Sequence, residues 1–363
     1  MERAAKIIAM RMKIRLLVIS QAALVILLIA AVASHRVPLG IPGEWEWLRV
    51  RANPPWISLI LAALGVACFC GLAALGLRTL LRPTRSIGKE ALWLFVLWVS
   101  SIAVQVIIPT GAADEYDLTK WAYVNVFTSS TGYYRIAKEQ AVGDPLKFLA
   151  DYPEWIKRQD SLHIGTHPPG LIALQCVLIK TMERYPRLAD ALSRTMPHST
   201  WEGFRQLEIM ERKPIPRADR AAIYLTSLIV LMACAGTVVP LYLLARSAMS
   251  SPASWAIASL WPLAPAANLF QPDADAAYPF LSAAALALAA WASKPHATPR
   301  ASTYRMLAAV ACGLILAFGN FFTLAFLPVG LIVGLLIAFA REIPLARRAV
   351  LALAVGAGFL SLI

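Results

Sequence analysis

Nine long apolar runs constrain most strongly what this chain can fold into. They lie at 14–34, 56–77, 91–109, 221–245, 253–270, 276–293, 306–319, 321–340 and 349–363. Several approach or exceed the length that lets a helix cross the roughly 30 Å hydrocarbon core of a bilayer. With 59% apolar and only 15% charged residues, a soluble domain of this size would lack polar surface. The sequence therefore predicts an all-α, polytopic transmembrane bundle of about nine spans.

The formal charge of +13 fits a membrane protein better than a nucleic-acid-binding one. Basic residues gather in cytoplasmic loops and beside anionic lipid headgroups, so a positive balance is expected for a chain in contact with membrane lipids. No RNA- or DNA-reading motif accompanies the charge. We expect no nucleic-acid partner.

The basic residues also predict the orientation of the spans. Three short connections are rich in Lys and Arg, at 78–89, 294–305 and 341–348, whereas the opposing turns at 271–275 and Asn320 carry none. Because cytoplasmic loops hold the excess of basic residues, the N-terminus is expected in the cytoplasm. The first apolar run is longer than a signal-peptide core, which favours an uncleaved anchor.

This orientation holds only if the apolar stretch 169–183 does not cross the membrane, and it is short for a span. We expect it to lie in the outer interface, inside one large extracytoplasmic loop over 110–220. The predicted organisation is two N-terminal transmembrane helices in 1–90, followed by a membrane domain over 91–363. Because the last apolar run ends without a polar tail, the natural chain is expected to continue beyond Ile363.

Acidic residues stand at two places on the predicted outer face. Asp114 and Glu115 follow directly after the span at 91–109, where such residues are often only solvated. Asp273 lies in the tight turn "QPDAD" at 271–275. Carboxylates in a turn that barely leaves the hydrocarbon are costly unless they point into a polar cavity or a partner, so this turn is expected to support a site.

The stretch "LHIGTHPPGLIAL" contains two histidines ahead of an apolar run. His163 and His167 have the H-x-x-x-H spacing that presents two imidazoles for zinc on a helix. Gly165 and the proline after His167 argue against a helix there. Pro168 and Pro169 instead suit a helix start, where the missing N–H groups cost little.

Several motifs occur in the order of a known superfamily, between Ala91 and about Trp291. After the acidic pair come "GYYRIAKE" (132–139), "HPPG" opening a short apolar helix, and "PLYLLARSAMSSPASWAIASLWPLAPAANLF" with an arginine-bearing turn; "QPDADAAY" (271–278) is last. In the order of these motifs, and in the side of the membrane predicted for each of them, the chain resembles the GT-C superfamily of membrane glycosyltransferases. Within that superfamily, the chain resembles bacterial protein mannosyltransferases and the lipid A aminoarabinose transferase.

The resemblance implies transfer of a sugar from a polyprenyl-phosphate carrier to a hydroxyl of a lipid, glycan or protein acceptor, at the outer face of a bacterial inner membrane. It implies that Asp114 or Glu115 is the catalytic carboxylate, that His167, Pro168 and Pro169 shape the pocket, and that Asp273 supports it. A carboxylate beside another one near a membrane has a raised pKa suited to a general base. We expect Asp114 to be that base.

Other residues are expected to contact the substrate or its phosphate, whose developing charge needs cations, a metal or backbone donors. They are His163, His167, Tyr134, Arg135 and Lys138. The sequence leaves open whether a divalent cation takes part as cofactor. Glu115, as an alternative to a second base, is the candidate metal ligand.

Two alternatives belong to other functional classes. A transporter or flippase would carry charged or Gly/Pro-broken segments in mid-span, often in two related halves. The spans hold almost no ionisable residues, and we find no internal repeat. A non-catalytic membrane assembly protein would tolerate replacement of Asp114 and Glu115.

Overall fold

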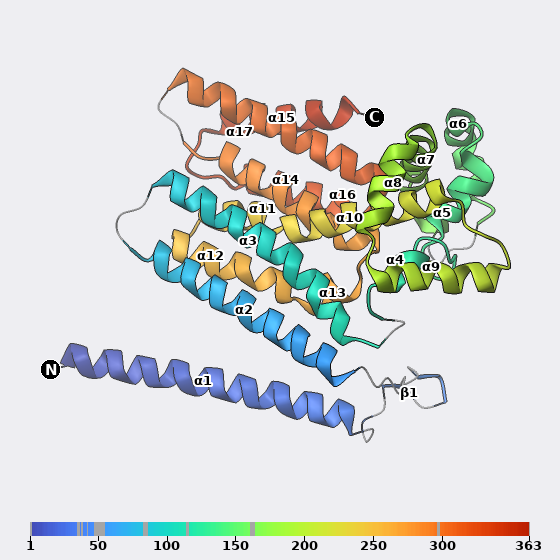
Figure 1. The fold of residues 1–363 in the computed structure, drawn as a ribbon. Helices are drawn as coiled ribbons and strands as arrows, with labels where there is room; N and C mark the ends of the chain where they lie inside the picture. The colour runs from blue at the N-terminus through green and yellow to red at the C-terminus, as the bar shows by residue number, and fades with distance from the viewer. Residues whose placement is uncertain are drawn as a thin grey trace. The chain divides into compact units, whose positions relative to one another are not determined.

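The structure, a computed structural model, is α-helical almost throughout, as the sequence predicted (Figure 1). It describes residues 2–34, 37, 39–41, 43–46, 55–82, 86–113, 116–159, 164–295 and 298–362. The chain divides into two compact units, Met1–Asn53 and Pro54–Ile363. Each unit is therefore considered by itself.

The first unit consists of one long helix and a small β-ladder. Helix α1 (Glu2–Ala33) contains the apolar stretch Ile19–Ala33. Two-residue strands β1 (Gly40–Ile41) and β2 (Trp45–Glu46) pair in antiparallel fashion. Gly43, between them, has φ +84°, a left-handed conformation that glycine adopts at no steric cost.

Five helical segments of the second unit are long and apolar enough to cross a membrane. They are Trp56–Leu80 (α2); Ile87–Gly111, comprising α3 (Ile87–Ile107) and a 3-10 turn; Arg217–Arg246, comprising α10 (Arg217–Gly236) and α11 (Val238–Arg246); Ala274–Ala292, ending in α14 (Tyr278–Ala292); and Ser302–Phe322, within α15 (Pro299–Phe322). Leu61 and Leu64 of α2 are exposed, which is unfavourable in water and suits contact with lipid chains. Five of the about nine expected spans thus meet the length that a bilayer requires.

The other apolar runs of this unit form shorter helices. The run expected as one span over 253–270 is divided into α12 (Ser251–Leu260), a 3-10 turn and α13 (Pro265–Leu269). The physical reason is Pro262 and Pro265, which lack the N–H that a continuous helix needs. Helices α16 (Phe326–Ala338) and α17 (Leu345–Leu360) complete the bundle.

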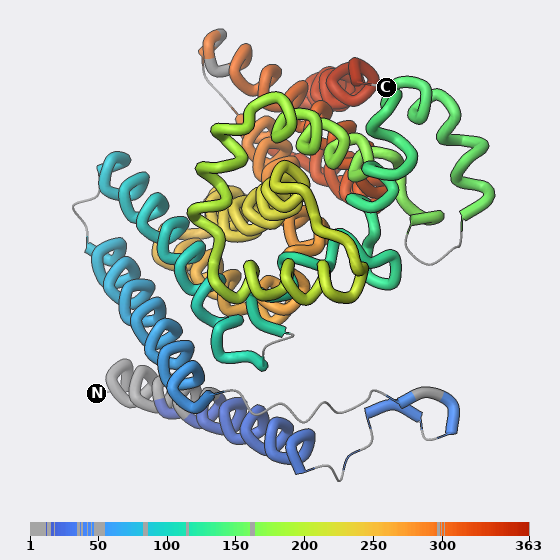
Figure 2. The backbone as a smooth tube through the Cα atoms, turned by 45° about the vertical axis from the view of Figure 1, so that its right-hand side comes forward, coloured from blue at the N-terminus to red at the C-terminus, as the bar shows by residue number. Residues whose placement is uncertain are grey.

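The segment between α3 and α10 forms a helical cap at one end of the bundle (Figures 1 and 2). Its described residues, 116–159 and 164–216, are called the cap below. Its helices are α4 (Lys120–Tyr123), α5 (Tyr133–Ile136), α6 (Pro145–Ile156), α7 (Gly170–Arg184), α8 (Pro186–Thr195) and α9 (His198–Glu211), with a π-helical turn at Ala137–Ala141 and a 3-10 turn at Ile164–Thr166. Buried Trp121, Ile172 and Phe204 pack with Ile223 of α10 in one core.

Helix α7 agrees with the helix expected from the double proline. It begins at Gly170, directly after Pro169, and is 15 residues long. It is not among the five segments long enough to span. The expectation of a short helix within the loop, opened by the two prolines, is confirmed.

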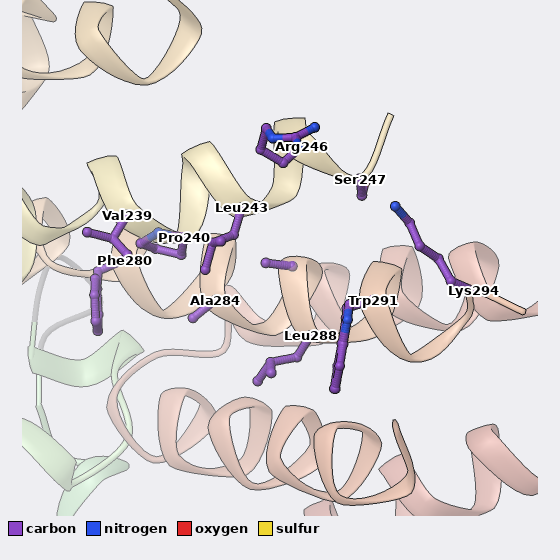
Figure 3. A pocket seen from close by; sticks show the side chains of 11 residues that line it. Val239, Pro240, Leu243, Arg246, Ser247, Phe280, Ala284, Leu288, Trp291 and Lys294 are labelled. Carbon is purple, nitrogen blue, oxygen red and sulfur yellow. The ribbon is translucent and has the colours of Figure 1, made fainter. Parts of the chain in front are cut away.

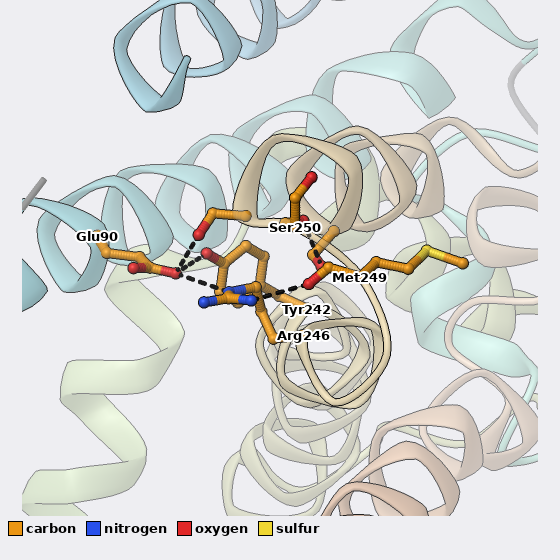
Figure 4. A network of polar contacts seen from close by, with 7 residues as sticks. Glu90, Tyr242, Arg246, Met249 and Ser250 are labelled. Atoms are coloured by element: carbon orange, nitrogen blue, oxygen red, sulfur yellow. Dashed lines mark hydrogen bonds and ion pairs between the residues drawn. The ribbon is translucent and has the colours of Figure 1, made fainter. Parts of the chain in front are cut away.

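A polar network (Figure 4) holds three helices together, at the end of the bundle away from the cap (Figure 1). The Glu90 carboxylate of α3 accepts hydrogen bonds from Tyr242 Oη, from Arg246 Nε at 3.2 Å and from Ser251 Oγ at 3.1 Å. Arg246 Nη1 also donates to the Met249 carbonyl at 2.8 Å. The network therefore joins α3, α11 and α12 and holds the Arg246 guanidinium in one orientation.

Candidate functional site

Three of the residues named from the sequence lie outside the described part of the chain. They are Asp114, Glu115 and His163. Their roles stay predictions. The described residues that follow the acidic pair are ordered by local contacts, since Asp117 Oδ1 accepts the backbone N–H of Thr119 at 2.6 Å.

The structure brings His167 and Asp273 together, although they are 106 positions apart in the sequence. Both lie beside Tyr133 of α5. The ring centroids of Tyr133 and His167 are 6.1 Å apart in an edge-on arrangement, and His167 and Asp273 interact electrostatically. We call Tyr133, Tyr152, His167, Asp273 and Asp275 the His167–Asp273 cluster.

Local backbone features bring the members of this cluster to one place. Gly132 has φ +67° immediately before α5, a conformation that favours glycine, and Tyr133 is the first residue of that helix. The Tyr152 hydroxyl of α6 donates to the His167 carbonyl at 2.6 Å. Asp273 caps a 3-10 turn by accepting the Asp275 N–H at 3.4 Å.

Burial dominates the electrostatics of the cluster. It raises the pKa of Asp273, and the neighbouring Asp275 carboxylate raises it further, whereas His167 opposes the shift. Burial also raises the pKa of Tyr133, with added contributions from Asp273 and Asp275, and raises that of Tyr152 to about 12. The two phenols therefore stay protonated, and Asp273 is a stronger base than an ordinary aspartate.

An apolar cavity of about 260 Å³ adjoins the cluster, between α7, α10, α14 and α15. Tyr133 belongs to the cluster and also lines the cavity. Two buried polar atoms in the cavity wall, Asn125 Nδ2 and Tyr278 Oη, have no hydrogen-bond partner among the described residues. Because buried polar groups are almost always paired, this wall suits a ligand with an apolar tail and acceptor oxygens.

The remaining predicted contacts lie at a separate pocket of about 180 Å³, lined by Tyr134, Arg135 and Lys138. Arg135 forms an ion pair with Glu211. Lys138 Nζ lies 3.0 Å from carboxylate oxygens of both Glu183 and Asp219. The two groups of predicted residues are therefore not in one pocket, although Tyr133 and Tyr134 adjoin in α5.

Burial and charge both shift the pKa values of this second group, in opposite directions for Lys138 and in the same direction for Tyr134. Burial alone would lower the pKa of Lys138, but hydrogen bonds and charges from Glu183 and Asp219 outweigh it, so the pKa is raised. Burial raises the pKa of Tyr134, and the Asp219 charge adds to that effect. Lys138 thus stays a cation, held by two carboxylates.

Sequence reasoning did not single out Lys120, which links the acidic segment to the Asp273 turn. Its ammonium donates to the carbonyl oxygens of Asn268 at 3.2 Å and Leu269 at 2.9 Å, two residues at the end of α13. Burial lowers the pKa of Lys120 to about 8, against an opposing effect of Asp117. An isolated lysine after "DEYDLT" gives no sequence signal for such long-range contacts.

Tyr133, Tyr152 and Asp275 were also not chosen as contacts from the sequence. Asp275 lies in the "QPDAD" turn that was predicted to support a site, and Tyr133 adjoins Tyr134, which was predicted as a substrate contact.

No group of three His, Cys, Asp or Glu able to hold a metal ion occurs among the residues that the structure describes. Comparisons with protein-family models, with curated proteins and with solved structures found no match.

Proposed function

We propose that the protein is a membrane glycosyltransferase that moves a sugar from a polyprenyl-phosphate carrier to an acceptor hydroxyl. The observation that carries this proposal is the His167–Asp273 cluster beside an apolar cavity with two unpaired polar atoms. A polyprenyl-phosphate sugar has the matching parts, because its chain is apolar and its phosphate and hydroxyls accept hydrogen bonds. Ligand pockets typically have such apolar walls with a few polar groups, and the apolar prenyl chain of the carrier fits this one.

The reaction needs a base for the acceptor and a charged environment for the leaving group. The proton of the acceptor hydroxyl passes to a carboxylate as the acceptor oxygen bonds to the anomeric carbon. The bond from that carbon to the phosphate oxygen breaks, and the polyprenyl phosphate keeps the electron pair. Asp114 is the proposed base, with Glu115 as second carboxylate or metal ligand, and His167 and Asp273 shape the pocket.

The proposed phosphate contacts fall into two groups. Asn125 and Tyr278 supply a neutral amide and a hydroxyl at the cavity wall. Arg135 and Lys138 supply positive charge from the second pocket, and each already has a carboxylate partner. A phosphate would have to compete with those carboxylates, so we rank the two cations below the cavity wall.

The proposed orientation puts the N-terminus in the cytoplasm and the cap on the outer face of a bacterial inner membrane. Basic residues support it, because the connections at 78–89, 294–305 and 341–348 are rich in Lys and Arg. The helix ends that these connections join lie at the end of the bundle away from the cap. Cytoplasmic loops carry this excess in multi-pass proteins.

The test is a transfer assay with the full chain in proteoliposomes, fed radiolabelled polyprenyl-phosphate hexoses and a cell extract as acceptor source. We expect Asp114→Asn to lower the rate by about 10²- to 10⁴-fold, as for loss of a general base. Asp151→Asn, at an exposed position of α6, is the matched control and should retain the wild-type rate. An inert wild type with every donor, or full activity of Asp114→Asn, would contradict the proposal.

One observation favours a second candidate, a flippase for a lipid-linked sugar. The apolar run after α11 is broken at Pro262 and Pro265, and discontinuous helices line the substrate sites of many transporters. The same proteoliposomes distinguish the two functions. Movement of intact labelled donor between leaflets without release of polyprenyl phosphate would favour the flippase.

A further inference from the structure

A second apolar pocket, of about 560 Å³, lies between α11 and α14 (Figure 3). Val239, Pro240 and Leu243 line it from α11. The α14 side is formed by residues at helical spacing, namely Phe280, Ala284, Ala287, Leu288 and Trp291. Because residues three, four and seven apart share one helix face, the pocket is a groove that runs along both helices.

The groove faces outward from the bundle. Leu243 is 52% exposed and Trp291 45% exposed, although both are large and apolar. Ala284 and Ala287 leave room between the helices, since each ends at Cβ. An open apolar groove on helices long enough to span a bilayer is a surface for lipid chains rather than for water.

Positive charge is confined to one end of the groove, at Arg246 and Lys294. Figure 3 shows the Lys294 side chain extending toward Ser247, with Arg246 on the same side. Lys294 comes two residues after α14 ends at Ala292, as expected for a residue at a membrane surface. No hydrogen-bond or ion-pair partner of its ammonium is found within the described part of the chain.

The charges at this end do not cancel. Glu90, which is not among the residues that line the groove, accepts a hydrogen bond from Arg246 Nε, and it compensates one of the two positive charges. No carboxylate lines the groove itself. A third cation is close by, because the Arg305 guanidinium lies 5.7 Å from the centre of the Trp291 ring. The end of the groove therefore has a net positive charge and suits an anionic group.

We propose that this groove binds one anionic phospholipid of the surrounding bilayer. Its phosphate contacts Arg246 and Lys294, and an acyl chain lies along Leu243 and Leu288. Trp291, with an apolar ring and a polar N–H, suits the boundary between headgroup and chain. Basic pockets between transmembrane helices are known to favour such headgroups. The site is separate from the His167–Asp273 cluster and does not depend on the proposed transfer activity.

The test measures lipid retained by the full chain in detergent, by native mass spectrometry, with equimolar phosphatidylglycerol and phosphatidylcholine of identical acyl chains. We expect one phosphatidylglycerol retained in preference. Lys294→Gln should lower that preference about fivefold, since one basic residue at a membrane surface contributes about that factor. Lys89→Gln, the same charge change at an exposed position at the same end of the bundle, should not alter the preference. Ala287→Phe should lower the retention of both lipids by filling the groove.

Three outcomes would overturn the proposal. The first is equal retention of both lipids by the wild-type chain. The second is an equal loss for Lys294→Gln and Lys89→Gln, which would indicate diffuse surface charge. The third is displacement of the lipid by inorganic phosphate, or by polyprenyl phosphate at a lower concentration than phosphatidylglycerol itself, which would assign the groove to a free anion or to the carrier.

Discussion

Replacement of Gly170 by Ala tests how closely the start of α7 must approach the membrane bundle. Gly170 is the first residue of α7 and follows His167, Pro168 and Pro169. A Cβ added there would lie 2.3 Å from the carbonyl oxygen of Phe321 and 2.8 Å from its carbonyl carbon. Both are backbone atoms near the end of α15, so no side-chain rotation can relieve the overlap.

The expected loss in the free energy of unfolding follows from this distance. Cβ contacts below 3.0 Å essentially never occur, so the two backbones must separate by roughly 0.7 Å, and such overpacking typically costs about 1–3 kcal/mol. Alanine offsets a small part of this cost, because it is favoured over glycine by about 0.5–1 kcal/mol in the middle of a helix and by less at its first residue. We expect a net loss of about 1–2 kcal/mol in the free energy of unfolding.

The same shift should affect the site. His167 lies three residues before Gly170, so movement of the α7 start displaces it from Asp273 and Tyr133. A displacement near 1 Å can lower a catalysed rate by about 10²-fold. We therefore expect Gly170→Ala to lose most of the proposed transfer activity along with stability.

Thermal unfolding of the purified full chain in detergent, with the transfer assay in proteoliposomes, checks both effects. Gly143→Ala is the matched control, because a Cβ there meets nothing within 4 Å. It should match or slightly exceed the wild-type unfolding temperature. The reasoning is refuted if Gly170→Ala unfolds at or above the wild-type temperature, since the close approach to the Phe321 backbone would then not be real.

Three further predictions concern charge and packing. Burial and a neighbouring carboxylate raise the pKa of Asp273 above its ordinary 3.8 in the folded state. The contribution of Asp273 to the free energy of unfolding is therefore fully present below about pH 4, and it is lost as the pH rises through the folded-state pKa. Asp273→Asn should therefore unfold at a higher temperature than wild type at pH 7 and at the same temperature at pH 4; a lower value at pH 7 would show the sign to be wrong. Lys138→Met should lower the unfolding free energy by about 1–3 kcal/mol, because the buried Asp219 loses its cationic partner. Adding Asp219→Asn should restore part of that loss in a double-mutant cycle; additive losses would argue against the pair. Gly358→Ala should destabilise the protein, because its Cβ would lie 2.2 Å from a backbone oxygen of α15. Gly356→Ala is the control and should not destabilise it, because a Cβ there meets nothing within 4 Å. Equal unfolding temperatures of the two variants in detergent would contradict the close packing of α15 and α17.

Parts of the candidate site could be predicted from the sequence, but not their arrangement. His167 and Asp273 were both noticed because prolines and carboxylates are unusual beside apolar runs. Their meeting next to Tyr133 depends on contacts between segments far apart in the chain. Tyr133 and Tyr134 look equivalent in the sequence, and only the packing of α5 directs one to the cluster and the other toward Asp219.

The sequence also could not predict which groups pair with the cations. Arg135 and Lys138 were expected as phosphate contacts because they are basic residues in the outer loop. Their partners Glu211, Glu183 and Asp219 lie 45 to 81 positions away, and no periodicity links them. Lys120 likewise contacts carbonyl groups about 150 positions along the chain.

The sequence by itself determined the helical class, the main apolar segments and the start of α7 after Pro169. These features depend on properties that act locally, namely the transfer free energy of consecutive apolar side chains and the restricted backbone of proline. The break of 253–270 into two short helices also depends on local residues, Pro262 and Pro265. Tertiary structure alone decided that His167 lies near Asp273 and that a groove with a cationic end runs along α11 and α14. Those features arise from contacts between distant segments, whose energies depend on side-chain shape and burial that no local pattern records.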